Sequence, residues 1–213
     1  MVSKLRGALI VFEGCDRAGK SLQAKKLVER ICGTGAHAEL ISFPDRLSDL
    51  GKFIDCYLKK KLEMQPREAH LIFAANRQAL MPLMKEKLLQ GIHLVVDRYI
   101  YSGIAYTLAK EDESVTMEWA KMADIGELRP DCVIYLNLPL EEAQKRDGFG
   151  HERFDFNEFQ KKVNNVMVKL AAEDEDLWQI IDASLSVDEV SETVWKTVAP
   201  TLNNVGKCDL NFF

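Results

Sequence analysis

Glycine, lysine and serine residues follow an apolar run near the start of the chain, and their types and spacing are suited to binding phosphate. Gly14 and Gly19 enclose a short loop that leads directly into Lys20 and Ser21, in the pattern Gly-x-x-x-x-Gly-Lys-Ser. Glycines allow a tight turn in which backbone N–H groups face phosphate oxygens, the lysine adds a positive charge, and the serine hydroxyl can bind Mg²⁺. The pattern therefore predicts a site for a nucleoside triphosphate.

An aspartate and an arginine, Asp97 and Arg98, follow a second apolar run. In a parallel sheet the carboxyl ends of neighbouring strands lie at the same edge, so we expect Asp97 to hold Mg²⁺, directly or through water, together with Ser21. Arg98 can neutralise a transferring phosphoryl group. An ion pair that only caps the strand is the alternative interpretation at this point.

Apolar runs of strand length alternate with helical patterns along the chain, and this alternation predicts how the two loops are positioned. Strands are expected at residues 8–13, 37–42, 92–96, 132–138 and 178–181, the last three as runs buried on both faces of a sheet. Helices are expected at residues 23–31, about 48–60, 66–89 and about 101–124. The fold class is therefore α/β, with a parallel sheet covered by helices on both sides.

Composition limits the partners that this chain is expected to have. The 213 residues are 47% hydrophobic and carry a net charge of −5, which indicates a single domain over 1–213 that binds neither nucleic acid nor a membrane surface. Five scattered cysteines indicate reduced thiols in a cytoplasmic setting, with nuclear or mitochondrial pools as alternatives. Residues 203–213 lack periodicity and are expected to form a mobile tail, although Phe212 and Phe213 can dock on the body.

Five blocks of sequence, in the same order as in a known family, resemble thymidylate kinase and in particular its eukaryotic branch, which also carries an arginine in the phosphate loop. They are Gly14–Ser21, Phe43-Pro44-x-Arg46, Phe73–Arg77, Asp97–Tyr106 and Phe149–Arg153. The resemblance implies a P-loop NTPase-type nucleoside monophosphate kinase fold: a five-stranded parallel sheet with helices on both faces and a lid at about 145–155. It implies transfer of the γ-phosphoryl group of ATP to dTMP, giving dTDP and ADP with Mg²⁺, in dTTP biosynthesis, by a homodimer.

The resemblance also assigns residues to the two substrates. The residues implied in catalysis are Arg17, Lys20, Asp97 and Arg98, and those implied in holding Mg²⁺ are Ser21 and Asp97. The residues implied in ATP binding are Gly14, Asp16, Arg17, Ala18, Gly19, Lys20, Ser21, Leu22, Arg146 and Arg153. The residues implied in dTMP binding are Asp16, Phe43, Arg46, Phe73, Arg77, Arg98, Ser102, Gly103 and Tyr106.

Phe73 and Arg77 are four residues apart in a predicted helix, so they share one face. By resemblance Phe73 stacks on thymine and Arg77 donates to its O4 atom. An arginine donor there would face the exocyclic amino group of cytosine and leave both groups unpaired. Taken as an isolated pair, these residues would be a core phenylalanine and a surface arginine.

Two glycines and several basic residues lie between two predicted helices at residues 145–153, which is typical of a lid. Arg146 or Arg153 can then reach ATP when the lid closes, whereas an ordinary solvated loop is the alternative. Three positions, Leu22, Asp45 and Phe154, depart from the pattern of the family.

Two other functions are compatible with a phosphate loop. One is a kinase for another nucleotide or a deoxynucleoside, but a nucleoside acceptor would leave Arg46 and Arg98 without a phosphate to bind. The other is a nucleotide-dependent switch protein, but the guanine-reading pattern Asn-Lys-x-Asp is absent from the sequence. Turnover with dTMP, dUMP, dCMP and thymidine distinguishes the first alternative, and consumption of ATP that depends on dTMP distinguishes the second.

Overall fold

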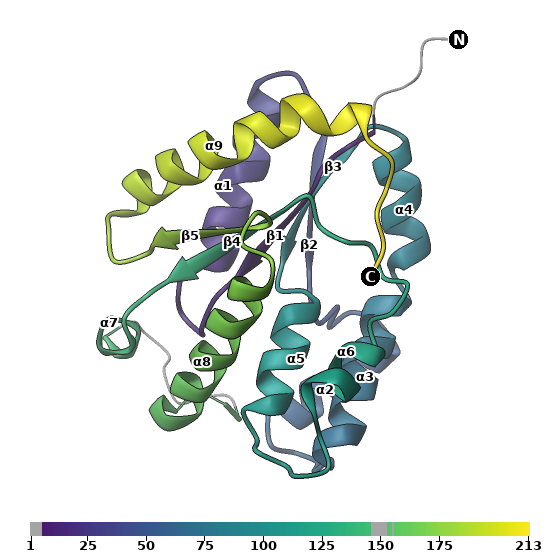
Figure 1. Ribbon diagram of the computed structural model, residues 1–213, viewed down its shortest axis with the longest axis vertical. Helices are drawn as coiled ribbons and strands as arrows, with labels where there is room; N and C mark the ends of the chain where they lie inside the picture. Colours follow the sequence, from purple (N-terminus) through teal and green to yellow (C-terminus); the bar gives the residue numbers. More distant parts are fainter. Residues whose placement is uncertain (1–5, 146–152, 155) are drawn as a thin grey trace.

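The computed structural model describes residues 6–145, 153–154 and 156–213, and its core is a parallel sheet with the strand order β2-β3-β1-β4-β5 (Figure 1). The strands are β1 (Leu9–Glu13), β2 (Ala38–Ser42), β3 (His93–Asp97), β4 (Cys132–Asn137) and β5 (Trp178–Asp182). The prediction of a five-stranded parallel sheet is confirmed. Phe12 pairs with Asp97, so the carboxyl ends of β1 and β3 lie level with each other.

Successive residues of β1 point to opposite faces of the sheet, and helices cover both faces. Leu9 and Val11 belong to one apolar cluster, whereas Ile10 and Phe12 belong to another. The first cluster is covered by α4 (Met81–Leu89), α5 (Ile100–Leu108) and α8 (Asn157–Glu173). The second is covered by α1 (Lys20–Gly33) and α9 (Val187–Asn204), which lie side by side in Figure 1.

The remaining helices are α2 (Asp49–Leu58), α3 (Pro66–Gln78), α6 (Met117–Met122), α7 (Leu140–Gln144) and a 3₁₀ turn, η1 (Val205–Lys207). Helices α2 and α3 share a small apolar cluster that includes Ile54, Tyr57 and Ala69. No helix within the described parts of the chain is both long enough and apolar enough to cross a bilayer.

Two predicted helices are wrong in their length. The segment 66–89 is split into α3 and α4, because Pro82 lies in the first turn of α4. A proline cannot donate a backbone hydrogen bond, and its ring would clash with the carbonyl of Gln78 in a continuous helix. The segment 101–124 is split into α5 and α6, and Glu111, with φ of 55°, lies in the connection between them.

Two other expectations need correction. Strand β5, at the edge of the sheet, is not buried on both faces, because Ile180 is 61% exposed. The tail that was expected to be mobile lies against the body, as the docking alternative proposed. Its last residues exchange backbone hydrogen bonds with the connection between α6 and β4, and Phe213 packs edge-on against Tyr101.

Candidate active site

The phosphate loop connects β1 to the first turn of α1, and its two glycines are required by the backbone. Gly14 has φ of 144°, and a Cβ there would lie 2.7 Å from the carbonyl oxygen of Leu136. Gly19 has φ of 94° and is the N-cap of α1. Because the helix begins without a side-chain cap, its first N–H groups are available to an anion.

Lys20 is buried at the start of α1, and its Nζ donates to the carbonyl of Cys15 at 2.7 Å. Burial lowers the pKa of Lys20 to about 8, an effect that the nearby Arg98 reinforces and the Asp16 and Asp97 carboxylates oppose. In this structure the Lys20 ammonium group therefore binds the main chain of its own loop. A phosphate bound nearby would raise the pKa of Lys20 and so keep the side chain charged.

Asp97 ends β3, next to β1, and brings its carboxylate to the first turn of α1. Ser21 donates its hydroxyl to Asp97 Oδ2. The other oxygen, Asp97 Oδ1, is buried and has no hydrogen-bond partner among the described residues. Thus the predicted neighbours Ser21 and Asp97 are together, with one carboxylate oxygen left over for a ligand.

Arg98 turns sharply away from β3, with φ of 67°, and its guanidinium lies between the phosphate loop and α5. It forms an ion pair with Asp16 and donates from Nη1 to Ser102 Oγ at 3.2 Å. Burial by itself would lower the pKa of Arg98, but Tyr106, Asp16 and Asp97 raise it above its ordinary value. The same pairing keeps the pKa of Asp16 low against the opposing effect of burial.

Gln160 in α8 is a site residue that the sequence reasoning missed. Its Nε2 donates to Asp16 Oδ2 at 2.8 Å, to the Phe154 carbonyl at 3.0 Å and to the Tyr106 hydroxyl at 3.3 Å. Its Oε1 accepts from the Asp16 backbone N–H at 3.0 Å. Gln160 is 1% exposed. The signal in the sequence was a glutamine directly after Phe159, among the apolar residues of a predicted helix.

Glu13, at the end of β1, is a second missed residue. Its carboxylate accepts from the backbone N–H groups of Tyr99 at 2.9 Å and Ser102 at 3.0 Å, and from the Ser102 hydroxyl at 2.6 Å. It thereby holds the first turn of α5 against the phosphate loop. Burial raises its pKa. A carboxylate within a run of buried apolar residues was the signal in the sequence.

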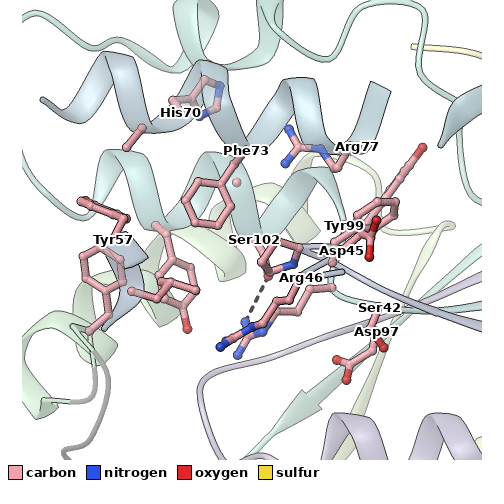
Figure 2. A pocket seen from close by; sticks show the side chains of 18 of the residues that line it. Ser42, Asp45, Arg46, Tyr57, His70, Phe73, Arg77, Asp97, Tyr99 and Ser102 are labelled. Atoms are coloured by element: carbon pink, nitrogen blue, oxygen red, sulfur yellow. Dashed lines mark hydrogen bonds between the residues drawn. The ribbon is translucent and has the colours of Figure 1, made fainter. Parts of the chain in front are cut away.

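A cavity of about 550 Å³ opens beside Asp97 and Arg98, between the sheet edge and helices α2, α3 and α5 (Figure 2). Phe73 extends from α3 into it, with Tyr57 on one side and Ser102 on the other. All the residues implied in acceptor binding line this cavity: Asp16, Phe43, Arg46, Phe73, Arg77, Arg98, Ser102, Gly103 and Tyr106. His70, Thr107, Lys110 and Phe154 also line it and were not predicted.

The interpretation of Arg77 as a surface residue is wrong, because its side chain is 3% exposed. Its Nη2 donates to Asp124, and its Nε lies 3.4 Å from Glu127 Oε2. Gly103 gives the guanidinium space, since a Cβ at that position would lie 2.9 Å from Arg77 Nη1. A buried, doubly paired arginine therefore faces the cavity from α3.

Three other predicted residues, Arg46, Leu22 and Ala18, differ in how far they are exposed. Arg46 lines the cavity but is 41% exposed and pairs with Asp55 at 2.8 Å. Leu22 is exposed on α1, and Ala18 is buried in the core cluster beneath the loop. Arg46 is thus the most solvent-accessible of the cationic side chains that line the cavity.

The two lid arginines are not brought to the phosphate loop. Arg146 lies outside the described residues. Arg153 donates to the carbonyls of Tyr57 and Leu62, each at 2.9 Å, and forms an ion pair with Glu63 at 2.7 Å. It is therefore engaged with the connection between α2 and α3.

A phosphate loop and an arginine-lined cavity meet at the carboxyl edge of this parallel sheet, and together they define a P-loop phosphotransferase of the nucleoside monophosphate kinase type. The family model for thymidylate kinase matches residues 12–194. The human thymidylate kinase is 47% identical over 189 residues, covering 89% of this chain and 88% of that protein. The Arabidopsis thaliana thymidylate kinase is 43% identical, covering 96% of this chain and 74% of that protein. The solved thymidylate kinase of Candida albicans superposes with a TM-score of 0.86 at 35% identity, covering 98% of both chains. The chain belongs to the thymidylate kinase family.

Proposed function

We infer that the chain transfers the γ-phosphoryl group of ATP to dTMP, giving dTDP and ADP, as a step of nucleotide biosynthesis. The observation that carries this conclusion is that the phosphate loop and the arginine-rich cavity share a residue, Asp16. Asp16 belongs to the phosphate loop, yet it also lines the arginine-rich cavity and pairs with Arg98. Two phosphate groups bound on either side of this ion pair would be close enough to react.

On the donor side, loop amides between Gly14 and Ser21 bind the phosphates of ATP, apart from that of Asp16, which donates to Gln160, and Lys20 supplies a charge. The lowered pKa of Lys20 supports this role, because a bound phosphate compensates the cost of burying the ammonium group. Arg17 adds charge from within the loop, and Leu22 contributes its backbone. Arg146 and Arg153 reach ATP when the lid at about 145–155 closes; for Arg153 this requires exchange of its contact with Glu63.

On the acceptor side, Phe73 stacks on the thymine base and Arg77 donates to its O4 atom. Ser102, Gly103 and Tyr106 complete the pocket of the base together with Phe43. Asp16 orients the sugar hydroxyl, and Arg46 and Arg98 bind the phosphate of dTMP. Support comes from the cavity, whose lining contains an apolar end at Phe73 and a cationic end at Arg98.

The reaction then needs little besides positioning and charge stabilisation. A phosphate oxygen of dTMP attacks the γ-phosphorus of ATP, the bond from that phosphorus to the bridging oxygen breaks, and ADP leaves with the electron pair. Lys20, Arg17 and Arg98 stabilise the charge that spreads over the transferring group. Arg98 also keeps the attacking oxygen in line, because its guanidinium is fixed by Asp16 and Ser102.

Mg²⁺ fits the residues at the carboxyl end of β3. Asp97 Oδ1 is a buried oxygen without a partner among the described residues, and the Ser21 hydroxyl lies beside the other oxygen of Asp97. No group of three or more His, Cys, Asp or Glu side chains is suited to hold a metal in the described parts of the chain. Ser21 and Asp97 would therefore hold the ion jointly with phosphate oxygens and water, and Mg²⁺ supplies charge neutralisation between the phosphates.

The proposal also covers the organisation of the enzyme. Residues 1–213 form one domain, and the enzyme works as a homodimer in the cytoplasm. Exposed apolar side chains of α3 and α4, namely Leu71, Leu83 and Leu89, support self-association. The five cysteines are all free thiols, in keeping with a reducing compartment. Sedimentation velocity tests the dimer, and a monomer at micromolar concentration would contradict it.

The test of the activity is ADP release by the purified protein with dTMP, dUMP, dCMP or thymidine as acceptor. We expect the highest kcat/KM with dTMP, and lower but measurable turnover with dUMP, because one methyl group changes kcat/KM by about tenfold to two hundredfold. Arg98→Ala should depress kcat, since it removes charge stabilisation of the migrating group. A higher efficiency with thymidine, or ATP consumption that does not depend on dTMP, would refute the proposal.

A further inference from the structure

The last residues of the described chain pair with the connection between α6 and β4. Gly126 N–H donates to the Phe213 carbonyl oxygen at 2.9 Å, and Phe213 N–H donates to the Glu127 carbonyl at 3.0 Å. Arg129 N–H donates to the Asn211 carbonyl at 2.8 Å, and Leu128 faces Phe212 in an antiparallel bridge. Figure 1 shows this yellow segment running past α4 toward α6. Residues 211–213 and 126–129 therefore form a short two-stranded ribbon.

Phe213 lines a second cavity, of about 310 Å³, which also borders Tyr101 and Ile104 of α5. Its ring packs edge-on against Tyr101 with centroids 6.1 Å apart, and Trp178 lies 4.7 Å beyond Tyr101. Asp124 lines the same cavity and at the same time pairs with Arg77, which lines the acceptor cavity. Asp124 thus lies between the tail and the acceptor site.

Asp124 and Glu127 hold the Arg77 guanidinium from one side. Both carboxylates are buried, at 1% and 0% exposure, and Glu127 has no hydrogen bond to either oxygen among the described residues. Burial, together with the neighbouring Asp124 carboxylate and against the effect of Arg77, raises the pKa of Glu127 to about 8. Such a cluster is costly to bury, so it persists only where the backbone that carries it is fixed.

We propose that residues 211–213 are a positioning element of the acceptor site: they fix the segment 124–129, whose Asp124 and Glu127 side chains orient Arg77 toward the base. The inference rests on the proposed function, since it concerns how that site recognises its acceptor. No atom of the tail touches substrate. Asp124 and Glu127 are positioning residues, and Phe213 acts on Arg77 through them.

The physical reason is that base recognition by Arg77 depends on the direction of its N–H groups. Asp124 and Glu127 approach the Nη2 and Nε atoms of the guanidinium, and Arg77 lines the acceptor cavity, so its remaining N–H groups are available to a base. Without the tail, the N–H groups of Gly126 and Arg129 would turn to water and the segment would be free to shift. Arg77 could then tilt, and the contrast between the O4 atom of thymine and the amino group of cytosine would weaken.

The test compares the full chain with a variant that ends after Leu210. We expect the KM for dTMP to rise between about twofold and thirtyfold, the range typical of coupling through a packed network. The KM for ATP should be unchanged, and the ratio of kcat/KM for dTMP over dCMP should fall. Calorimetric titration with dTMP alone should show the same loss of affinity without turnover.

Phe213→Ala is the second variant, in case the shortened chain does not fold, and it should give a smaller change in the same direction. Phe212→Ala is the matched control. The Phe212 ring lies on Lys85 of α4 and is 47% exposed, so its removal leaves both the backbone ribbon and the Tyr101 contact in place. Its kinetics should equal those of the full chain.

A double-variant cycle with Glu127→Gln decides whether the tail acts through this cluster. We expect the two changes together to raise the KM for dTMP less than the product of the separate increases. Full multiplicativity, an equal rise in the KM for ATP, or an unchanged KM for dTMP would each overturn the inference. An inactive full chain would instead refute the proposed function, so the two failures are distinguishable.

Discussion

Replacing Gln160 by leucine should test whether the phosphate loop is held from α8. The glutamine amide makes hydrogen bonds in both directions with Asp16, accepting from its N–H and donating to its carboxylate. It also donates to the Phe154 carbonyl and the Tyr106 hydroxyl. Leucine has a similar volume and fits the apolar face of α8, so the change removes these bonds with little change in packing.

The expected loss of stability follows from the groups left unpaired. A buried polar group without a partner costs about 1–3 kcal/mol, and the Asp16 N–H is the group that loses its described partner, whereas the Phe154 carbonyl still accepts from the Phe156 N–H at 2.9 Å. We therefore expect a loss of roughly 1–3 kcal/mol, which lowers the melting temperature by about 2–12 °C in a chain of this size. Because Asp16 pairs with Arg98, turnover should also fall, by about tenfold to a hundredfold.

Thermal unfolding and steady-state kinetics on the same preparation measure both effects. Gln179→Leu removes the same amide from the edge strand β5 and serves as the control, with a melting temperature and kcat near those of the parent. Gln160→Glu keeps the size but places a second carboxylate against Asp16, so its kcat should be lower still. A Gln160→Leu protein with the parent melting temperature and kcat would refute the reasoning.

Four further predictions concern charge and space at the site. Burial lowers the pKa of Lys20 to about 8, so kcat/KM for ATP should fall as the pH rises past that value; a flat profile would contradict the placement of its ammonium. The pKa of Glu127 is raised from 4.5 to about 8, so the folded state holds a proton that the unfolded state releases between these values, and stability falls as pH rises through them. Glu127→Gln should abolish this fall in urea unfolding at several pH values. Gly103→Ala should raise the KM for dTMP, because its Cβ would press on Arg77 Nη1 at 2.9 Å; an unchanged KM would show that the guanidinium moves at little cost. Phe73→Ala should raise the KM for dTMP and leave the KM for ATP unchanged, as measured with each substrate varied in turn.

Much of the site was predictable because its parts are short and local. The phosphate loop is a continuous segment whose glycines are needed for backbone angles that other residues rarely adopt, so its sequence pattern specifies its shape. Asp97 and Arg98 follow a short run of mostly apolar residues whose length is typical of a buried strand, and the structure has a strand there. The alternation of strands and helices then predicts that both segments meet at one edge of the sheet.

The errors arose where a helical pattern continued through a break. The spacing of apolar residues across 66–89 is helical on both sides of Pro82, and periodicity alone does not reveal that the chain changes direction there. Residue type by itself would also have placed Arg77 at the surface, which was the alternative to its place in the acceptor pocket. An isolated arginine is normally at the surface, and only the carboxylates of Asp124 and Glu127 make its burial possible.

The sequence by itself determined the fold class, the family and most of the residues in the phosphate loop and the neighbouring cavity, since each depends on residue type and short spacing. The tertiary structure alone decided what holds those residues in place. Gln160 bonds to Asp16 across 144 residues, Ser102 to Glu13 across 89, and Arg77 to Asp124 across 47. Such contacts depend on how helices and strands pack, and no local pattern encodes them, because the partners are brought together only when the whole core is formed.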